Sequence, residues 1–252
     1  MSARIVAVIN QKGGAGKTTT CVNLAHALSR LGYRVLTIDL DPQSHLGIAL
    51  GQTSRTQSGI DQVLLGLSSI EIQMLLVREN LNLIVAGPRL QEIEQLADGT
   101  SHRGDLLKTA LTNCNDLDFI FIDCPPSSGI LVANALFAAE ELLIPMTSDY
   151  MALQGLSHLM GTIKKFEAAL AKNYKIKLVM SRYIPTRRLS HDVLETIQKY
   201  FPNQILKTPI RETASLAESP SFGKTIFEYR PGWRSAKDFS SLANDFINER
   251  VM

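Results

Sequence analysis

The sequence has few cysteines, and their spacing gives little support to a cysteine-based metal site. Only Cys21, Cys114 and Cys124 occur among the 252 residues, and no two of them form a Cys-x-x-Cys pair. The five histidines are scattered as well, so the spacing indicates neither zinc nor an iron–sulfur cluster. Three unpaired thiols are typical of a protein in a reducing compartment, and we therefore expect a cytoplasmic location.

Long apolar runs are also missing. No run approaches the roughly 20 apolar residues that a bilayer-spanning helix needs, so we predict no membrane span. The chain is nevertheless 45% apolar, which is enough for a sizeable core. Neither a repeat nor a linker rich in proline, glycine or serine divides the chain. One domain over residues 1–252 is therefore the simpler interpretation.

Net charge is small for the whole chain, at +2, but it is unevenly distributed. Residues 1–150 contain 10 lysines and arginines against 15 aspartates and glutamates, whereas residues 151–252 contain 16 against 9. The basic second part could favour an anionic partner, either nucleic acid or a lipid surface. An ordinary solvated surface explains the same charges equally well.

Patterns typical of strands and helices alternate along the chain. Residues 4–10 form a continuous apolar run, as expected for a strand that is covered on both faces. Further strands are predicted at 34–39, 81–86, 118–123, 141–146 and 176–182, and helices at 17–31, 106–111, 131–139, 152–170, 190–200 and 235–249. This alternation predicts an α/β fold, with a mostly parallel, twisted β-sheet and helices on both faces. Residues 51–79 are the least regular part of the first half.

The last predicted helix carries an apolar stripe formed by Phe239, Leu242, Phe246 and Ile247. A membrane-targeting helix would have a basic polar face, but the charges of this helix nearly cancel. We therefore predict that the stripe packs in the core.

A glycine-rich loop lies between the first predicted strand and the first predicted helix. Glycines lack a Cβ, so their backbone can approach phosphate oxygens, which the loop amides and the helix dipole then surround. This strand–loop–helix context predicts a P-loop for ATP. The predicted phosphate-binding residues are Lys12, Gly13, Gly14, Ala15, Gly16, Lys17, Thr18 and Thr19.

Two residues of the loop have specific expected roles. Lys17 should reach the β- and γ-phosphates and act in catalysis, and Thr18 should place its hydroxyl on Mg²⁺. The loop departs from the ordinary pattern because Gln11 stands where a glycine is usual and Lys12 precedes the paired glycines. A plain turn is the alternative interpretation, and it is improbable for this composition.

Aspartates follow two of the predicted strands. Asp123 ends an apolar run in the form of a Walker B strand, and we expect it to hold Mg²⁺. Asp39 and Asp41 follow the second strand. We expect Asp39 to serve the phosphate loop or the metal shell, and Asp41 to position or activate the attacking water. Because Asp41 precedes Pro42, turn initiation is the alternative role for its side chain.

The segment at residues 123–129, Asp-Cys-Pro-Pro-Ser-Ser-Gly, follows the Walker B strand. A loop in this place could sense the γ-phosphate and switch between ordered forms as the nucleotide changes. A rigid turn before the next helix is the alternative.

Three motifs together resemble the ParA/Soj branch of the deviant Walker A ATPases, the ParA–MinD type. They are the loop that begins at Lys12, the Asp-Leu-Asp-Pro-Gln segment at 39–43 and the Phe-Ile-Asp-Cys-Pro-Pro segment at 121–126. Similarity extends through residues 145–156 and 216–223, and thus over most of the chain. The resemblance implies a P-loop NTPase fold and an ATPase that uses Mg²⁺ and is slow until a partner stimulates it.

The resemblance also implies how such an ATPase works. Lys12 would act in catalysis across the interface of an ATP-bound homodimer, and the dimer would bind DNA nonspecifically at the nucleoid. A ParB-like or cargo-adaptor protein would stimulate hydrolysis, so that a plasmid, a chromosome region or a protein assembly is partitioned or positioned. By the same resemblance, Arg182 and Pro209 lie near the adenine.

DNA binding is where the sequence departs from the family. Relatives usually carry an arginine at the position of Ser215. Other basic residues of the second half could contact phosphates instead. The candidates are Arg187, Arg188, Arg211, Lys224 and Arg230. Arg187 and Arg188 could equally be a solvated helix entrance.

Two other functions remain open from the sequence. A membrane-associated, MinD-like spatial regulator is one, although the nearly neutral last helix and the Asp-Pro-Gln segment disfavour it. The other is a biosynthetic or electron-transfer enzyme, such as an amidating synthase or a nitrogenase-type iron protein. We find no substrate site for the former and no suitable cysteine spacing for the latter.

Overall fold

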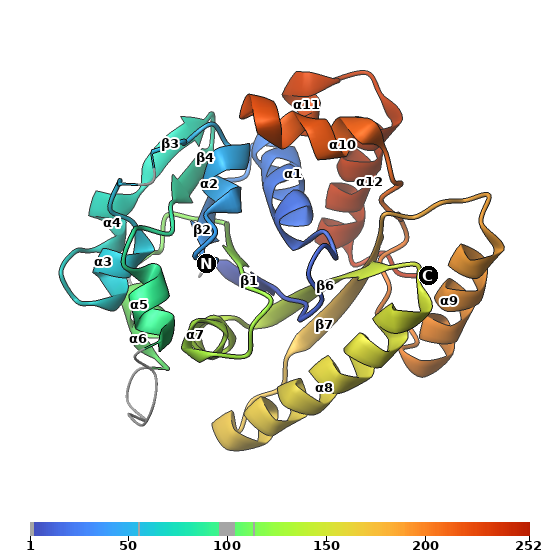
Figure 1. Ribbon diagram of the computed structural model, residues 1–252, viewed down its shortest axis with the longest axis horizontal. Coiled ribbons are helices and arrows are strands. Elements are labelled where there is room, and N and C mark those ends of the chain that lie inside the picture. The colour runs from blue at the N-terminus through green and yellow to red at the C-terminus, as the bar shows by residue number, and fades with distance from the viewer. Residues whose placement is uncertain (1–2, 55, 96–103, 113) are drawn as a thin grey trace.

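The computed structural model describes residues 3–54, 56–95, 104–112 and 114–252, and a seven-stranded sheet forms its centre (Figure 1). The strands are β1 (Arg4–Val8), β2 (Val35–Asp39), β3 (Leu75–Arg78), β4 (Leu81–Ile84), β5 (Phe119–Asp123), β6 (Glu141–Thr147) and β7 (Lys175–Ser181). Their order is β3-β4-β2-β5-β1-β6-β7. All neighbouring strands run parallel except β3 and β4, which pair antiparallel at one edge.

Helices cover both faces of this sheet. They are α1 (Lys17–Arg30), α2 (His45–Ala49), α3 (Ile60–Leu64), α4 (Ile70–Gln73), α5 (Leu90–Gln95), α6 (Leu106–Ala110), α7 (Ile130–Ala138), α8 (Tyr150–Leu170), α9 (Arg188–Tyr200), α10 (Ala214–Glu218), α11 (Ile226–Tyr229) and α12 (Arg234–Asn248), with a 3₁₀ turn η1 at Ser219–Phe222. One face packs against α1, α2 and α10 to α12, and the other against α3 to α9. Figure 1 shows the two layers on opposite sides of the strands.

The predicted fold class is confirmed, and the predicted elements end within about two residues of the observed ones. The irregular stretch at residues 51–79 contains elements that we did not predict, namely α3, α4 and the edge strand β3. They are four or five residues long, which is too short for a periodic pattern. In β3 the exposed fraction of Leu76 is 73%, so its apolar residues do not mark a buried face.

The predicted core role of the last helix is confirmed. Phe239, Leu242 and Phe246 of α12 are fully buried, and Ile247 is partly buried against the same cluster. The ring of Phe246 lies 5.8 Å from that of Phe121 in β5 and 6.1 Å from that of Phe119. Within the described part of the chain, no helix combines the length and the apolar character needed to cross a membrane.

The parallel register brings the functional aspartates to one edge of the sheet. Asp123 at the end of β5 is paired with Asp39 at the end of β2 and with Val8 at the end of β1. The glycine-rich loop follows β1 directly, so the loop and both aspartates meet at the carboxyl-terminal edge, where α/β sheets bind ligands.

A buried histidine fixes α11 on α1. His26 Nδ1 lies 2.6 Å from the Thr225 hydroxyl, and the imidazole packs edge-on against Phe227 with ring centres 5.5 Å apart. Burial lowers the pKa of His26 to about 4, and nearby Arg78 adds to this effect. The imidazole is therefore neutral in the native protein over a pH range in which the unfolded chain is protonated.

This difference predicts an acid-sensitive stability. Above pH 6.5 the imidazole is neutral in both states, and below this pH the unfolded chain takes up a proton that the native state does not. The free energy of unfolding should therefore fall by about 2–3 kcal/mol between pH 7 and pH 4.5 because of His26 alone. Urea unfolding at both pH values should show a smaller loss in His26→Gln than in the wild type. His158→Gln, on the exposed side of α8, is the matched control and should follow the wild type.

Candidate nucleotide-binding site

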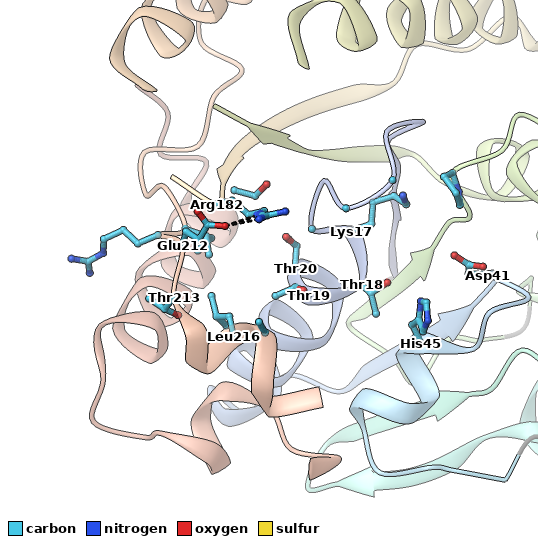
Figure 2. A pocket seen from close by; sticks show the side chains of 18 of the residues that line it. Lys17, Thr18, Thr19, Thr20, Asp41, His45, Arg182, Glu212, Thr213 and Leu216 are labelled. Carbon is cyan, nitrogen blue, oxygen red and sulfur yellow. Dashed lines mark hydrogen bonds and ion pairs between the residues drawn. The ribbon is translucent and has the colours of Figure 1, made fainter. Parts of the chain in front are cut away.

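A cavity of about 580 Å³ opens at the carboxyl-terminal edge of the sheet. Figure 2 shows Arg182 and Glu212 at one end of it and Asp41 and His45 at the other, with Lys17 and Thr18 between them. Of the predicted site residues, those that line it are Gly13, Gly14, Gly16, Lys17, Thr18, Thr19, Asp41, Arg182 and Arg211. Pro209 does not line the cavity. In that segment of the chain the first lining residue is Ile210, one position later.

The backbone of the loop has the shape that its glycines permit. Gly14 and Gly16 have φ angles of 72° and 90°, and Gly16 is the N-cap of α1. A side chain at Gly16 would be strained by its φ angle, and its Cβ would lie 3.3 Å from the Ser181 hydroxyl oxygen. The loop amides therefore precede a 14-residue helix whose N-terminus faces the cavity.

Two residues that the sequence analysis missed brace this loop. Buried Asn10 accepts a hydrogen bond from the Lys12 N–H at 2.9 Å and donates one to the Pro145 carbonyl at 2.7 Å. The Ser181 hydroxyl, at the end of β7, donates to the Ala15 carbonyl at 2.6 Å. Both are polar residues at the end of an apolar strand, which was the available sequence signal. They tie the loop to β6 and β7.

Lys17 and Asp123 are a buried pair of opposite charges beneath the loop. Burial lowers the pKa of Lys17, and the attraction of Asp123 opposes this shift. Burial raises the pKa of Asp123 to about 7, although the Thr18 hydroxyl and the Lys17 ammonium favour the charged form. Neither carboxylate oxygen of Asp123 has a hydrogen-bond partner with ordinary geometry among the described residues. Buried, unsatisfied carboxylate oxygens beside Thr18 suit a bound cation, and they fit the expected Mg²⁺.

Asp39 and Asp41 differ in burial and in hydrogen-bond partners. Asp39 is fully buried, and its oxygens accept hydrogen bonds from the N–H groups of Asp41, Leu46 and Gly47 at 3.1–3.2 Å. It thereby anchors the loop that carries Asp41, and its role as a metal ligand stays a prediction. Asp41 lines the cavity and accepts a hydrogen bond from the Gln43 N–H through one oxygen. That bond is the local turn expected before Pro42, and it leaves the other oxygen available.

Lys12 is held within its own chain. Its ammonium lies 2.6 and 2.7 Å from the two carboxylate oxygens of Asp149, the N-cap residue of α8, and 3.3 Å from the Thr147 hydroxyl. Burial alone would raise the pKa of Asp149, but hydrogen bonds from Lys12 and Thr147 lower it below its ordinary value. The lysine therefore has a specific acidic partner at the rim of the loop.

The loop after Asp123 is fastened by Glu94 of α5. This carboxylate accepts hydrogen bonds from the Ser127 hydroxyl at 2.7 Å and from the Leu131 N–H at 3.2 Å. A Cβ on Gly129 would lie 2.2 Å from a Glu94 oxygen, so only glycine leaves room for the contact. In the structure two hydrogen bonds to one distant side chain hold this loop, and switching with the nucleotide stays a prediction.

The predicted DNA contacts do not form one surface. Arg187 and Arg188 begin α9, whereas Lys224 and Arg230 flank α11, and these helices lie apart in Figure 1. Arg211 lines the cavity and forms a 2.9 Å ion pair with Asp238.

Of the two residues predicted to lie near the adenine, Arg182 lines the cavity and Pro209 does not. Arg182 has a left-handed φ of 49° and forms hydrogen bonds to Glu212 at the end of the cavity, at 2.6 and 2.8 Å. The base-binding role of this end stays a prediction.

Removing Asp149 should release Lys12. In Asp149→Asn the ammonium loses an ion pair worth about 1 kcal/mol, so its labelling by an amine-reactive acylating reagent should rise about three- to fivefold. Peptide mass spectrometry gives this rate, and Lys164 in the same digest is the internal control. Unchanged labelling of Lys12 would mean that Asp149 does not restrain it.

Removing Glu94 should loosen the loop at residues 125–131. Glu94→Ala leaves two hydrogen-bond donors without their charged acceptor, and we expect amide exchange there to speed up by about tenfold. Hydrogen–deuterium exchange measures this directly. Glu92→Ala, two residues away, removes only an exposed ion pair with Arg89 and serves as the control. Equal exchange in the two variants would contradict the role of Glu94.

Comparison with known proteins agrees with this geometry. The AAA domain family matches residues 3–178. The sporulation initiation inhibitor protein Soj of Bacillus subtilis is 37% identical over 246 residues, which cover 96% of this chain and 97% of Soj. The chromosome partitioning protein ParA of Myxococcus xanthus is 35% identical over 249 residues, covering 97% of this chain and 88% of ParA.

Solved structures share the fold over nearly the whole chain. A putative plasmid partition protein from Borrelia burgdorferi bound to AMPPNP is 26% identical with a TM-score of 0.84, covering 98% of this chain and 100% of that one. Cobyrinic acid a,c-diamide synthase from Mycobacterium smegmatis, with an ATP analogue and magnesium, is 29% identical with a TM-score of 0.82, covering 98% and 95%. The sequence relatives and the loop geometry agree, and this chain belongs to the ParA/Soj family of P-loop ATPases with a deviant Walker A motif.

Proposed function

We propose that this chain is a partitioning ATPase that binds Mg-ATP, dimerises in the ATP-bound state, binds DNA nonspecifically and hydrolyses ATP slowly until a partner stimulates it. The observation that carries the proposal is the buried Lys17–Asp123 pair beneath a glycine loop, beside a cavity large enough for a ligand of nucleotide size. Sequence relatives named Soj and ParA support the partitioning role.

The phosphates of ATP would lie on the amides of residues 13–19, with the Lys17 ammonium supplying the positive charge. Thr18 and Asp123 would hold Mg²⁺, which neutralises negative charge on the phosphates when it is bound. The unsatisfied oxygens of Asp123 support this assignment. Asp39 would act indirectly, because its hydrogen bonds hold the segment from Asp41 to Gly47 in place.

Hydrolysis requires a water that is aimed at the γ-phosphate. Asp41 is the candidate to orient it, because the side chain lies in the cavity wall and one of its oxygens is free of the local turn. The segment that Glu94 fastens follows Asp123 directly and contributes Pro126 to the wall. The loop is thus placed to respond to the γ-phosphate.

Lys12 would complete the site of a partner subunit. Lys17 already serves the subunit's own phosphates, and a cation supplied in trans can raise phosphoryl-transfer rates by roughly 10³–10⁵. The ion pair with Asp149 gives this proposal a physical cost, because Lys12 must exchange a carboxylate for a phosphate when the dimer forms. That exchange would contribute to slow turnover by the isolated chain.

The remaining parts of the proposal concern partners and location. Arg187 and Arg188 at the start of α9 would contact DNA phosphates and keep the dimer at the nucleoid in the cytoplasm, whereas Lys224 and Arg230 lie on a separate surface around α11. A ParB-like or cargo-adaptor protein would trigger release. The MinD-like alternative lacks support from α12, because its apolar stripe is committed to the core. The sequence relatives named Soj and ParA favour a partitioning role over that of an amidating synthase.

Mixing two inactive variants tests the central claim. Lys12→Ala should lack the cation supplied in trans, and Asp41→Ala should bind ATP, form dimers and bind DNA but not hydrolyse ATP. In a mixed dimer, the site that keeps Asp41 receives Lys12 from the other subunit. A one-to-one mixture should therefore recover about a quarter of the wild-type rate, because half of the dimers are mixed and each has one working site.

Gel filtration and DNA retention with ATP, ADP or no nucleotide accompany this assay. A mixture that stays inactive although mixed dimers form would show that Lys12 does not act in trans. Ordinary turnover by Asp41→Ala would remove Asp41 from its role. ATP-bound dimers that ignore DNA at low salt would refute the DNA-binding part alone.

A further inference from the structure

An aromatic ladder lies on the surface around α11, outside the nucleotide cavity. It consists of Phe222, Tyr229, Arg230 and Trp233. The rings of Phe222 and Tyr229 are stacked, with centres 5.1 Å apart and an interplanar angle of 25°. The Arg230 guanidinium lies 5.6 Å from the centre of the Tyr229 ring and 5.1 Å from that of Trp233. Four planar groups thus form one continuous row.

The two ends of this row, Phe222 and Trp233, are exposed to solvent although they are large aromatic side chains. The exposed fraction is 62% for Phe222 and 56% for Trp233, which is the only tryptophan in the sequence. Large aromatic side chains that gather in water rather than in the core mark interaction sites more often than chance. Tryptophan, tyrosine and arginine are also the residues that contribute most to the affinity of protein interfaces.

Positive charge surrounds the ladder. Lys224, Arg230, Arg234 and Lys237 are all exposed, and none forms an ion pair with another described residue. Lys237 lies one turn after Trp233 along α12, so the two share a helix face.

The two acidic residues nearby are already engaged. Glu228 pairs with Arg78 at 3.0 Å, and Glu218 accepts a hydrogen bond from the Tyr229 hydroxyl at 2.9 Å. Glu218 keeps its negative charge, but the four exposed cations outnumber it, so the surface has net positive charge next to exposed aromatic area.

We infer that this ladder is a docking surface for an acidic segment of a partner protein that carries aromatic or aliphatic side chains. The cations match the acidic residues of such a segment, and the rings match its apolar ones. Nucleic acid fits less well. Phe222 and Tyr229 stack on each other and the Arg230 guanidinium lies over the Tyr229 ring, so these groups do not offer separated faces to bases.

The ladder is one contact away from the nucleotide cavity. Leu216 and Ala217 of α10 line the cavity, and Glu218, the next residue, holds the Tyr229 hydroxyl. A protein bound on the ladder would therefore press on an element of the cavity wall. The identification of the bound protein as the stimulating partner rests on the proposed function. Its expected composition, acidic with apolar side chains, rests only on the residues of this surface.

A random peptide library displayed on phage tests the inference without a known partner. The nucleotide-free wild-type chain is the target, and Phe222→Ser is used for counter-selection. We expect enriched peptides to be net acidic and to contain aromatic or aliphatic residues. A synthetic copy of the most enriched peptide should shift the fluorescence of Trp233, and both Phe222→Ser and Arg230→Glu should weaken its binding about tenfold or more.

Matched controls separate the surface from general effects. Ile72→Ser removes an equally exposed apolar side chain elsewhere, and Lys199→Glu reverses an exposed charge on α9; both should bind the peptide like the wild type. Enriched peptides that are basic or lack apolar residues would overturn the inference. So would equal binding by all variants, or a fluorescence shift caused by a single-stranded oligonucleotide but by no peptide. ATP hydrolysis by the same wild-type sample is measured separately, so failure of the proposed function is recognised independently.

Discussion

The site is organised around a carboxylate that the protein buries without satisfying. Asp123 ends a fully buried strand, and the chain provides no hydrogen bond of ordinary geometry to either of its oxygens within the described residues. Lys17 beside it is buried as well, and burial lowers the pKa of its ammonium. Desolvated charges of this kind destabilise the fold until a ligand completes them. In the proposed function, a phosphate pairs with the Lys17 ammonium and Mg²⁺ pairs with the Asp123 carboxylate.

The surroundings of this pair are rigid where the phosphates would lie. Asn10 and Ser181 attach the loop to neighbouring strands, and Asp39 anchors the segment that carries Asp41. Such bracing lets the backbone amides point at the ligand before it arrives, which reduces the reorganisation that binding requires. The buried His26 contact extends the same rigidity to α11 on the outer face.

Two contacts at the rim of the site are weaker, because each joins a functional segment to a single carboxylate from which it can separate. Lys12 is paired with Asp149, and the loop after Asp123 is fastened by Glu94. Both are single carboxylates at partly exposed positions, where an ion pair or a hydrogen bond is worth only about 1–3 kcal/mol. In the proposed function, contacts with the nucleotide and the partner would replace them. The aromatic ladder around α11 adds a surface from which a bound protein would reach the cavity through α10.

Much of this protein follows from local sequence. Apolar strands that end in aspartate, a glycine loop after the first strand and helical periodicity between strands predicted a mostly parallel sheet and a site that includes Lys17, Thr18, Asp41 and Asp123. These features are local, because backbone preferences and apolar patterns are set by residues that are close in the chain. The short elements at residues 51–79 were missed because four or five residues leave no periodicity to detect.

The tertiary structure alone decided the pairings that join distant segments. The partners of Lys12, the 94–127 contact and the bracing of the loop by Ser181 each depend on how strands and helices pack. No pattern of spacing encodes such contacts, because a side chain's partner across 30 to 170 residues is fixed only when the sheet order and the helix layers bring the two together.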